Sequence, residues 1–515
     1  MRAQGTSPGG GAAMTDFGLT DLPDGRLFVG GVWETGTGAE IVSTFPADGS
    51  ENRRLTGASR ADGERAIARA VAAQADPAWR GLKAHERARY LYRIADGIEA
   101  ARDRIAFIQS RDTGKTLTET RALAASAAGT FRYFGAALET LDDALTVPRG
   151  DYLTLSVHEP LGLVSAITPW NSPIASDAQK VAPALAAGNA VLLKPASWSP
   201  LVALELARIV EASGLPAGLF SVLPGAGREI GTLLVEHPAI GRVSFTGGTE
   251  TGRMLARQAA DKLMPVSLEL GGKSPTIVLE DCDIDLAVAG VMFGVFSSTG
   301  QSCIAGSRLF VARAIHQRFV ARLVAATRAL KVGHPFDPAT QVAPMVHVEH
   351  RDAVAAMVAQ AVAEGAQVLC GGAIPEGPEF DGGAYYLPTI LAGLPNDAPI
   401  CREEVFGPVL AVIPFDDEAE MIRQANDNAY GLACGIWSRD FPRAWRLARA
   451  ITTGTVWINT YKQFSISTPF GGEKDSGTGR EKGRAGIREY MAQKSVYLDL
   501  TGLPHPWALP ALAAS

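Results

Sequence analysis

Short apolar runs alternate with helical patterns between residues 163 and 260, and this alternation constrains the fold more than any other feature of the chain. The apolar runs cover residues 163–168, 190–195, 219–223 and 242–246. The helical patterns between them cover residues 176–187, 200–213, 227–236 and 250–260. Apolar strands separated by helices form a parallel sheet that is covered on both faces. The segment therefore predicts a doubly wound, nucleotide-binding architecture, with ligands beyond the carboxyl ends of the strands.

A second alternation of the same kind begins near residue 275 and predicts a second α/β domain. Its expected strands are 275–279, 307–312, 367–370, 409–414 and 454–458. Its expected helices are 284–297, 314–329, 350–364, 417–426 and 441–450. Together the two alternations predict an α/β protein with two parallel-sheet domains, which 515 residues are enough to form.

The N-terminal part and the end of the chain have other patterns. Short strands are expected within 24–45, followed by helices at 61–78, 85–111 and 116–141. Residues 152–158 alternate like a strand, and 485–501 predict a further strand-bearing segment that pairs with something distant in the sequence. Flexible tails are expected at 1–20 and 502–515.

Composition excludes several classes of protein. A net charge of −6 gives no global footprint for nucleic acid, and no apolar run approaches a membrane span. The N-terminus lacks the apolar segment of a secretory signal, so the cytoplasm is the expected compartment. Five cysteines without a signal make a disulfide framework unexpected. His347 and His350 are the one close histidine pair; without a third ligand they indicate an exposed helix start, and no metal is expected.

Two sequence features are suited to binding a nucleotide. The motif FTGGTETGR at 245–253 follows an expected strand and opens a helix. Gly247 and Gly252 let the backbone approach a phosphate at the positive end of that helix, although a plain glycine turn is about as consistent with the motif. Lys194 ends an expected strand on the ligand side and suits a ribose or phosphate, the alternative being a solvated lysine.

Three other residues suggest covalent catalysis. Cys303 lies in GQSCIAGSR between tight turns, where a thiol is exposed and reactive, although a lone cysteine is more often a small buried residue. Glu269 in LELGGKSP sits among leucines, which raises a carboxyl pKa and suits a general base; a paired structural glutamate is the alternative. Asn171 in ITPWNSP offers an N–H to an oxyanion, or forms a turn between two prolines.

Taken together, these five motifs strongly resemble those of the aldehyde dehydrogenase superfamily, in its hydrolytic, non-acylating form. EEVFGPVL at 403–410, NAYGLACGIWS at 428–438, GTVWIN at 454–459 and PFGGEKDSGTGRE at 469–481 extend the resemblance from about residue 26 to residue 500. The resemblance implies an enzyme that oxidises a small-molecule aldehyde to the carboxylic acid with NAD(P)+. It also implies the aldehyde dehydrogenase-like fold.

The resemblance assigns a role to each matching position. Cys303 would attack the aldehyde, Asn171 and the Cys303 backbone N–H would hold the oxyanion, hydride transfer would leave a thioester, and Glu269 would activate the water that hydrolyses it. Lys180 and Glu481 match positions that relay the proton outward. The implied cofactor contacts are Thr168, Pro169, Trp170, Lys194, Gly247, Gly248, Gly252, Leu270, Glu404 and Phe406. The implied substrate pocket comprises Ser172, Ser176, Gln179, Ser302, Ile304, Tyr461, Lys462 and Phe464.

Some positions depart from the family pattern. Ser197 stands where NAD-preferring members often carry a glutamate, and Gly248 stands where many members have a serine. A glutamate would repel a 2′-phosphate, whereas Ser197, Lys194 and Arg228 together suit one. The cofactor is therefore expected to be NADP or NAD, with NADP well accepted; the alternative is that Arg228 is merely exposed and Ser197 tolerates both.

A second departure concerns the substrate. Ser172, Ser176 and Gln179 replace large apolar residues of the tunnel, and Lys462 stands at its mouth, so a polar or carboxylate-bearing aldehyde is expected. The alternative is that Lys462 points to solvent.

The resemblance also divides the chain. A dinucleotide-binding domain is expected from 21–141 and 160–268, and a catalytic domain from 269–485. A small β oligomerisation element would comprise 142–159 and 486–501 and join subunits into a homodimer or homotetramer. Two alternatives for the function remain: a coenzyme-A-acylating semialdehyde dehydrogenase, which usually lacks the glutamate, and a non-catalytic binding protein on the same fold.

Overall fold

The computed structural model describes residues 17–508 and residue 511 of the chain. Most of the expected N-terminal tail, 1–16, and residues 509–510 and 512–515 of the expected C-terminal tail lie outside the described residues. From Phe17 onward the chain packs on the protein, since the Phe17 ring stacks on Phe107 at 5.6 Å between centroids. A 3-10 turn, η2 (Leu19–Asp21), follows.

The first sheet has eight strands in the order β2-β1-β9-β8-β7-β10-β11-β21. Their bounds are β1 Leu27–Val29, β2 Val32–Glu34, β7 Leu163–Ile167, β8 Ala190–Lys194, β9 Phe220–Val222, β10 Ile240–Thr246, β11 Val266–Glu269 and β21 Gly477–Thr478. The five strands from β9 to β11 are parallel, which confirms the predicted doubly wound architecture. From β7 the chain moves outward to β8 and β9, then returns to the other side for β10. The strand order therefore reverses between β7 and β10, where such sheets bind ligands.

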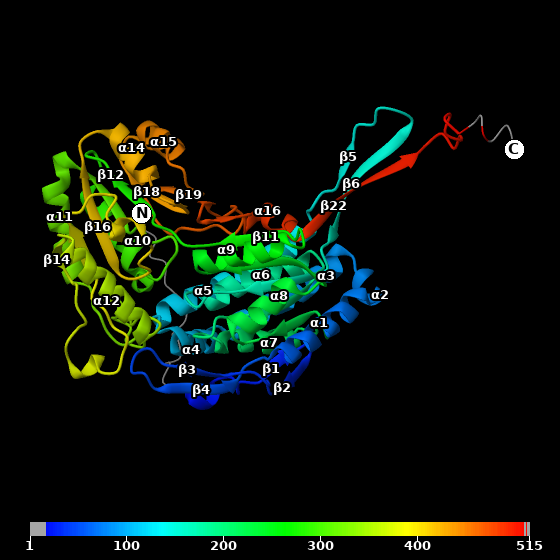
Figure 1. The fold of residues 1–515 in the computed structure, drawn as a ribbon, viewed down its shortest axis with the longest axis horizontal. Coiled ribbons are helices and arrows are strands. Elements are labelled where there is room, and N and C mark those ends of the chain that lie inside the picture. Colours follow the sequence, from blue (N-terminus) through cyan, green and yellow to red (C-terminus); the bar gives the residue numbers. More distant parts are fainter. Residues whose placement is uncertain (1–16, 509–510, 512–515) are drawn as a thin grey trace, which may run out of the picture.

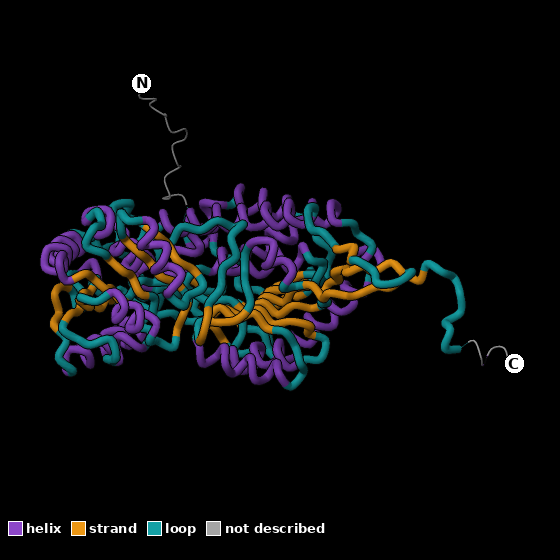
Figure 2. The backbone as a smooth tube through the Cα atoms, turned by 90° about the horizontal axis from the view of Figure 1, so that it is seen from above, coloured by secondary structure: helices purple, strands orange, loops and turns teal. Residues whose placement is uncertain are grey.

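Helices cover both faces of the first sheet, as Figure 2 shows. They are α1 Arg60–Ala75, α2 Pro77–Arg80, α3 Ala84–Ala100, α4 Arg102–Thr113, α5 Leu117–Leu138, α6 Pro173–Ala186, α7 Leu201–Ala212, η3 Gly227–Gly231, α8 Thr232–Glu236 and α9 Thr249–Ala260. Alternate strand residues serve the two faces: Val164 joins the core under α3, α5, α6 and α7, whereas Leu163 joins the core under α1, α8 and α9.

Two features of the N-terminal part differ from the sequence-based expectation. The single helix expected over 85–111 is two helices, α3 and α4, because the backbone leaves the helical region at Ala101. In addition, β3 (Glu40–Thr44) pairs with β4 (Glu51–Thr56). Strand β4 was not predicted, because its sequence ENRRLT is rich in charged residues and has no apolar run.

The second sheet has seven strands in the order β14-β15-β16-β13-β12-β18-β19, all parallel except β14. Their bounds are β12 Pro275–Val278, β13 Arg308–Ala312, β14 Gln367–Cys370, β15 Thr389–Ala392, β16 Val409–Phe415, β18 Ala433–Trp437 and β19 Thr455–Ile458. The helices are α10 Ile284–Phe296, α11 Arg313–Arg328, α12 Val348–Ala363, α13 Pro399–Arg402, α14 Glu418–Asn426 and α15 Phe441–Ala450. Strands β15 and β18 were not predicted, but the second α/β domain is confirmed.

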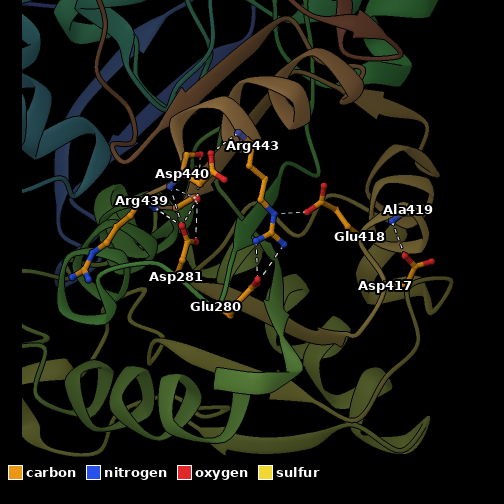
Figure 3. A network of polar contacts seen from close by, with 9 residues as sticks. Glu280, Asp281, Asp417, Glu418, Ala419, Arg439, Asp440 and Arg443 are labelled. Atoms are coloured by element: carbon orange, nitrogen blue, oxygen red, sulfur yellow. Dashed lines mark hydrogen bonds and ion pairs between the residues drawn. The ribbon is translucent and has the colours of Figure 1, made fainter.

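An ion-pair network fastens α15 to its surroundings in this second domain (Figure 3). Arg443 donates to Glu418 at the start of α14, and to Glu280 just after β12, at 2.7 Å each. The Asp281 carboxylate accepts the backbone N–H groups of Arg439 and Asp440 at 2.9 Å each. The network thus joins the segments that follow β12, β16 and β18 at the carboxyl ends of these strands.

A third sheet, of three strands, projects from the body of the molecule (Figure 1). It comprises β5 Ala144–Thr146, β6 Tyr152–Pro160 and β22 Met491–Asp499. β22 pairs antiparallel with β6 over nine residues, so the segment 485–501 does pair with a distant part of the chain. The short helix α16 (Gly483–Arg488) leads into β22. In the described part of the chain, none of the helices has both the length and the apolar character needed to cross a membrane.

Candidate active site

A cavity of about 780 Å³ opens at the carboxyl ends of β7, β10 and β11 and meets the loop that precedes β13. The predicted site residues that line it are Pro169, Trp170, Asn171, Ser172, Ser176, Gln179, Gly247, Gly248, Glu269, Leu270, Ser302, Cys303, Ile304, Glu404, Phe406, Lys462, Phe464 and Glu481. Most of the positions singled out in the sequence therefore meet at one place, which is the point where the strand order of the first sheet reverses.

Cys303 lies on a tightly wound loop. The loop follows α10 through η4 (Ser297–Gly300), where Ser298 and Thr299 have φ values of 58° and 54°. Cys303 is half-buried, whereas the four other cysteines are buried, so it alone meets the exposure that a nucleophile needs. Burial, Glu404 and Glu269 raise the pKa of the Cys303 thiol to about 12, and Lys462 acts in the opposite direction. The resting group is thus a thiol.

Asn171 faces the same loop from the end of β7. Its side-chain Nδ2 donates to the Gln301 carbonyl at 3.0 Å. Gln301 is in turn held by the Val346 N–H, which donates to its Oε1 at 2.9 Å. The Asn171 amide has a second N–H, so it can donate to another oxygen beside Cys303 without leaving this position.

Glu269 is the last residue of β11 and is only 4% exposed. Its Oε2 has no hydrogen-bond partner among the residues the structure describes. Burial and the neighbouring Glu481 raise the pKa of Glu269 well above its usual value, while Lys180 acts in the opposite direction. A carboxyl that retains its proton to higher pH and has a free oxygen facing a cavity suits general-base work near neutral pH.

Lys180 and Glu481 form a buried ion pair behind Glu269. The Lys180 Nζ lies 2.5 Å from Glu481 Oε1 and donates to Ser244 Oγ at 3.1 Å. The Tyr490 hydroxyl also contacts Ser244 Oγ at 3.1 Å. Glu481 lines the cavity, whereas Lys180 lies behind it, so a continuous set of polar groups leads inward from the cavity wall.

The expected substrate residues divide into two groups. Ser172 and Ser176, with hydroxyls 3.1 Å apart, line the cavity, and so does Lys462. Lys462 does not point into solvent, because its Nζ donates to Ser297 Oγ at 2.8 Å. Tyr461 lies outside the lining: it is 2% exposed and its hydroxyl donates to the Ile304 carbonyl at 3.0 Å. Its ring occupies space left by three glycines, so it supports the cysteine loop from behind.

On the cofactor side, Trp170 is surrounded by aromatic rings. Its ring centroid lies 5.2 Å from Phe406 and 5.3 Å from His350, and His350 Nε2 is 2.9 Å from the Phe406 carbonyl oxygen. His347 stacks on Trp198 at 5.5 Å, so neither histidine of the pair is simply exposed. The Glu404 Oε1 accepts the Gly272 N–H at 2.9 Å, and burial raises the pKa of Glu404 to about 7.

The remaining expected cofactor residues lie beside the cavity rather than in its lining. Thr168 is buried behind Lys194 and its N–H donates to the Lys194 carbonyl at 3.1 Å. Gly252 lies inside α9 and is not part of a turn. It lets the helix pack closely on the Leu270 side chain, because a Cβ at this position would lie 2.4 Å from Leu270. Ser197 and Arg228 are both exposed.

A phosphate-bearing dinucleotide fits these residues. Helix α9 begins at Gly248 without a side-chain cap, so its first N–H groups are available, and a Cβ on Gly248 would meet nothing within 4 Å. Lys194 is only 6% exposed, its ammonium donates to the Pro195 carbonyl at 3.2 Å, and burial lowers its pKa to about 8. Both features leave hydrogen-bond donors for an anionic ligand.

Several lining residues were missed by the sequence analysis. They are Lys115, Thr118, Glu119, Ala122, Leu123, Ser126, Ala175, Trp198, Thr246, Gly271, Phe293, Ser297, Ser298, Gln301, His350, Phe470 and Lys482. Thr246, Gly271, Gln301 and Phe470 lie inside the motifs quoted from the sequence, and Lys482 directly follows Glu481, so adjacency to a motif was the available signal. The residues from 115 to 126 and from 293 to 298 come from the start of α5 and the end of α10, where helical periodicity indicates only which face is buried. Within the described ranges, no group of three or more side chains is placed to hold a metal ion.

Comparisons with known proteins agree with this geometry. A family model described as the aldehyde dehydrogenase family matches residues 33–496. Betaine aldehyde dehydrogenase of Brucella anthropi is 42% identical over 487 residues, 94% of this chain and 99% of that protein. Betaine aldehyde dehydrogenase 2 of Rhizobium meliloti is 43% identical over 93% of this chain and 98% of its own length.

Solved structures show the same likeness. A putative aldehyde dehydrogenase from Burkholderia cenocepacia superimposes with a TM-score of 0.92 at 37% identity, covering 94% of this chain and 99% of that one. Betaine aldehyde dehydrogenase from Staphylococcus aureus in complex with NAD+ gives 0.92 at 34% identity, with 95% and 97% covered.

Proposed function

Because this chain belongs to the aldehyde dehydrogenase family, we propose that the cavity beside Cys303 is the site of its chemistry. The protein is an NAD(P)-dependent enzyme that oxidises aldehydes. The observation that carries the proposal is the convergence of Cys303, Asn171 and Glu269 on one cavity at the ligand-binding edge of the sheet. These three side chains supply a nucleophile, an oxyanion donor and a base, which together suffice for acyl transfer through a covalent intermediate.

Cys303 is the nucleophile of the proposed mechanism. The Cys303 thiol first gives its proton to water in the cavity. The thiolate sulfur then attacks the aldehyde carbon, a C–S bond forms as the C=O π bond breaks, and the carbonyl oxygen becomes an oxyanion. The free N–H of Asn171 and the backbone N–H of Cys303 donate to that oxyanion. A bound dinucleotide would supply the hydride acceptor, so that the acyl group would remain on Cys303 as a thioester.

Glu269 is the base that hydrolyses the thioester. Its ionised form takes a proton from water, the hydroxide adds to the thioester carbon, and the Cys303 sulfur leaves as the carboxylic acid forms. Because burial raises the pKa of Glu269, the ionised fraction grows as the pH rises toward that pKa. The Lys180–Glu481 pair receives the proton from the Glu269 side of the cavity.

The cofactor site accepts NADP+ as well as NAD+ in this proposal. Ser197 and Arg228 are exposed beside the buried Lys194, and no carboxylate occupies the position of Ser197. A 2′-phosphate would gain a hydroxyl donor and two cations there, whereas a glutamate would repel it. The residues that would hold the pyrophosphate are Gly247 and Gly248 at the start of α9.

The projecting β-sheet is proposed to join subunits into a homodimer or homotetramer. Among the residues that the structure describes, β22 and β5 are the two edge strands of this sheet, and Leu145 and Tyr497 on them are exposed. Light scattering on the intact protein should give a mass that is a small multiple of 54.2 kDa; a monomer at assay concentration would refute this assignment.

The test of the function is the absorbance of reduced cofactor after mixing the enzyme with a simple aldehyde, with and without coenzyme A. We expect steady turnover without coenzyme A and the free acid as product. If turnover needs coenzyme A and yields the acyl thioester, the hydrolytic role of Glu269 is wrong. If no aldehyde is oxidised under either condition, the assignment of the site itself is wrong.

A further inference from the structure

Two lysines that the proposed chemistry does not use line the same cavity at its substrate end. Lys115 immediately precedes Thr116, the N-cap of α5, and Lys462 follows β19 on the loop that carries Phe464. Lys115 is buried and Lys462 is half-buried. A buried cation is costly unless an anion or several acceptors surround it, so the partners of these two groups decide what the cavity can bind.

Lys115 is 4% exposed, and the hydrogen bonds that this residue makes within the described part of the chain involve its backbone and not its ammonium group. The backbone is fixed, since its carbonyl accepts the Ser110 hydroxyl at 2.6 Å and its N–H donates to Thr113 Oγ1 at 3.4 Å. Burial lowers the pKa of the Lys115 ammonium, and the negative charge of Glu119 acts in the opposite direction without restoring the usual value.

Lys462 lines the same cavity, and its ammonium lies close enough to Lys115 for the two charges to interact. Its Nζ donates to Ser297 Oγ at 2.8 Å and approaches the Ser297 carbonyl at 3.5 Å, both neutral acceptors. Burial and the charge of Lys115 lower the pKa of Lys462 to about 7, so the two cations repel each other. Lys462 also acts electrostatically on the Cys303 thiol, which places it near the reacting sulfur.

The carboxyl groups of the cavity do not neutralise this pair. Glu119 is the carboxylate whose charge raises the pKa of Lys462. Its oxygens already accept hydrogen bonds from the Ser298 N–H at 2.6 Å and the Thr116 hydroxyl at 3.1 Å. Glu481 is paired with Lys180. Glu269 and Glu404 lie at the catalytic and cofactor ends, and burial raises the pKa of each. Two cations therefore share one carboxylate that already has hydrogen-bond partners.

We infer that Lys115 and Lys462 form a receptor for a carboxylate on the substrate, so that the enzyme's preferred aldehyde is an anion. The inference rests on the proposed function, because the aldehyde carbon must reach Cys303 while the carboxylate meets the two lysines. Each ammonium would donate a charge-assisted hydrogen bond to the carboxylate, and the anion would remove the repulsion between them. The same pair would repel a quaternary ammonium aldehyde, the substrate that several relatives are named for.

A third lysine of the cavity lacks this property and provides a matched control. The Lys482 Nζ lies 3.8 Å from the centre of the Phe464 ring, and 5.3 Å from that of Phe470, so aromatic faces already stabilise it. It acts on Glu481, Glu269 and Cys303 rather than on Lys462. Removing its charge should change the rate for all aldehydes together and leave the preference among them unchanged.

The test compares kcat/KM for 4-oxobutanoate, 5-oxopentanoate and 6-oxohexanoate with that for butanal, pentanal and hexanal, and for betaine aldehyde. In the wild type, we expect the best anionic aldehyde to exceed its alkanal counterpart by about tenfold or more, the size of one charge-assisted hydrogen bond. Lys462→Met and Lys115→Met should each reduce that ratio by about tenfold, and Lys462→Arg should retain it. Lys482→Met should leave the ratio within about threefold of the wild type.

The outcomes separate this inference from the proposed function. If alkanals are oxidised as fast as all three anionic aldehydes, or betaine aldehyde is preferred, the carboxylate receptor is wrong and the enzyme assignment stands. If the ratio is high but unchanged in Lys462→Met, the receptor lies elsewhere and the inference fails, even where Lys115→Met does not fold. If no aldehyde of any charge is oxidised, the proposed function fails first.

Discussion

Replacing Glu269 by glutamine should separate the two halves of the reaction. Glutamine has the shape of the protonated carboxyl that burial favours at this position, but it cannot accept a proton. The attack by Cys303 and the first release of reduced cofactor should therefore survive. Hydrolysis of the thioester should slow by about 10²–10⁴-fold, the usual contribution of a general base.

The same substitution should stabilise the fold, with an effect that grows with pH. The folded chain holds the Glu269 proton above the ordinary pKa of 4.5, whereas the unfolded chain loses it there. Between those two pKa values the folded state binds more protons, so the wild-type free energy of unfolding falls as pH rises. A tenfold difference in proton affinity between the folded and unfolded states corresponds to about 1.4 kcal/mol in the free energy of unfolding. Glutamine does not titrate, so the variant does not lose this stability as the pH rises. The stability advantage of Glu269→Gln should thus be small at pH 5 and larger at pH 8.

The assays are stopped-flow absorbance for the burst and thermal unfolding midpoints at several pH values. Glu376→Gln is the control, since Glu376 is exposed and its replacement should give a difference that does not change with pH. Loss of the burst in Glu269→Gln would show that Glu269 activates the thiol. A midpoint difference that is the same at pH 5 and pH 8 would refute the argument from burial.

Four further substitutions test other parts of the structure. Cys303→Ala should reduce turnover by several orders of magnitude while cofactor still binds by fluorescence titration, and near-normal turnover would remove the nucleophile from the proposal. Ser197→Glu should lower the kcat/KM ratio of NADP+ to NAD+ by about tenfold or more, and an unchanged ratio would exclude the 2′-phosphate site. Gly435→Ala would place a Cβ 2.6 Å from the Tyr461 ring and should cost about 1–3 kcal/mol. By contrast, Gly129→Ala in α5 meets nothing within 4 Å and should stabilise by about 0.5–1 kcal/mol; a melting series checks both.

The architecture and the centre of the site could be predicted because strand ends are visible in a sequence. Asn171 and Glu269 each follow or end an apolar run, and parallel strands bring such ends to one edge of a sheet. Strand β18 was missed because Ala433–Trp437 contains a glycine and a cysteine, which weaken the apolar signal. The break between α3 and α4 occurs at Ala101, which is neither a proline nor a glycine, so the residue at the break gave no sequence signal for it.

The substrate end could not be predicted in full, because it depends on packing between distant segments. Tyr461 was expected in the pocket, but three glycines remote from it in sequence make room for its ring behind the Ile304 carbonyl. Lys115 sits beside a helix cap, where a lysine is ordinarily solvated. Its burial follows from the loop around Ser298, whose N–H binds Glu119 on the first turn of α5.

The ion pair between Lys180 and Glu481 joins residues 301 positions apart, and both are buried. During synthesis, the ribosome releases Lys180 long before its counter-ion, and β21, the last strand of the first sheet, also comes from residues 477–478. A nascent chain that ends before this point carries an uncompensated buried lysine and an open sheet edge, both of which disfavour the compact state. The proposed catalytic centre is therefore complete only when translation is nearly finished, because a chain that ends before residue 477 lacks both Glu481 and one strand of the first sheet.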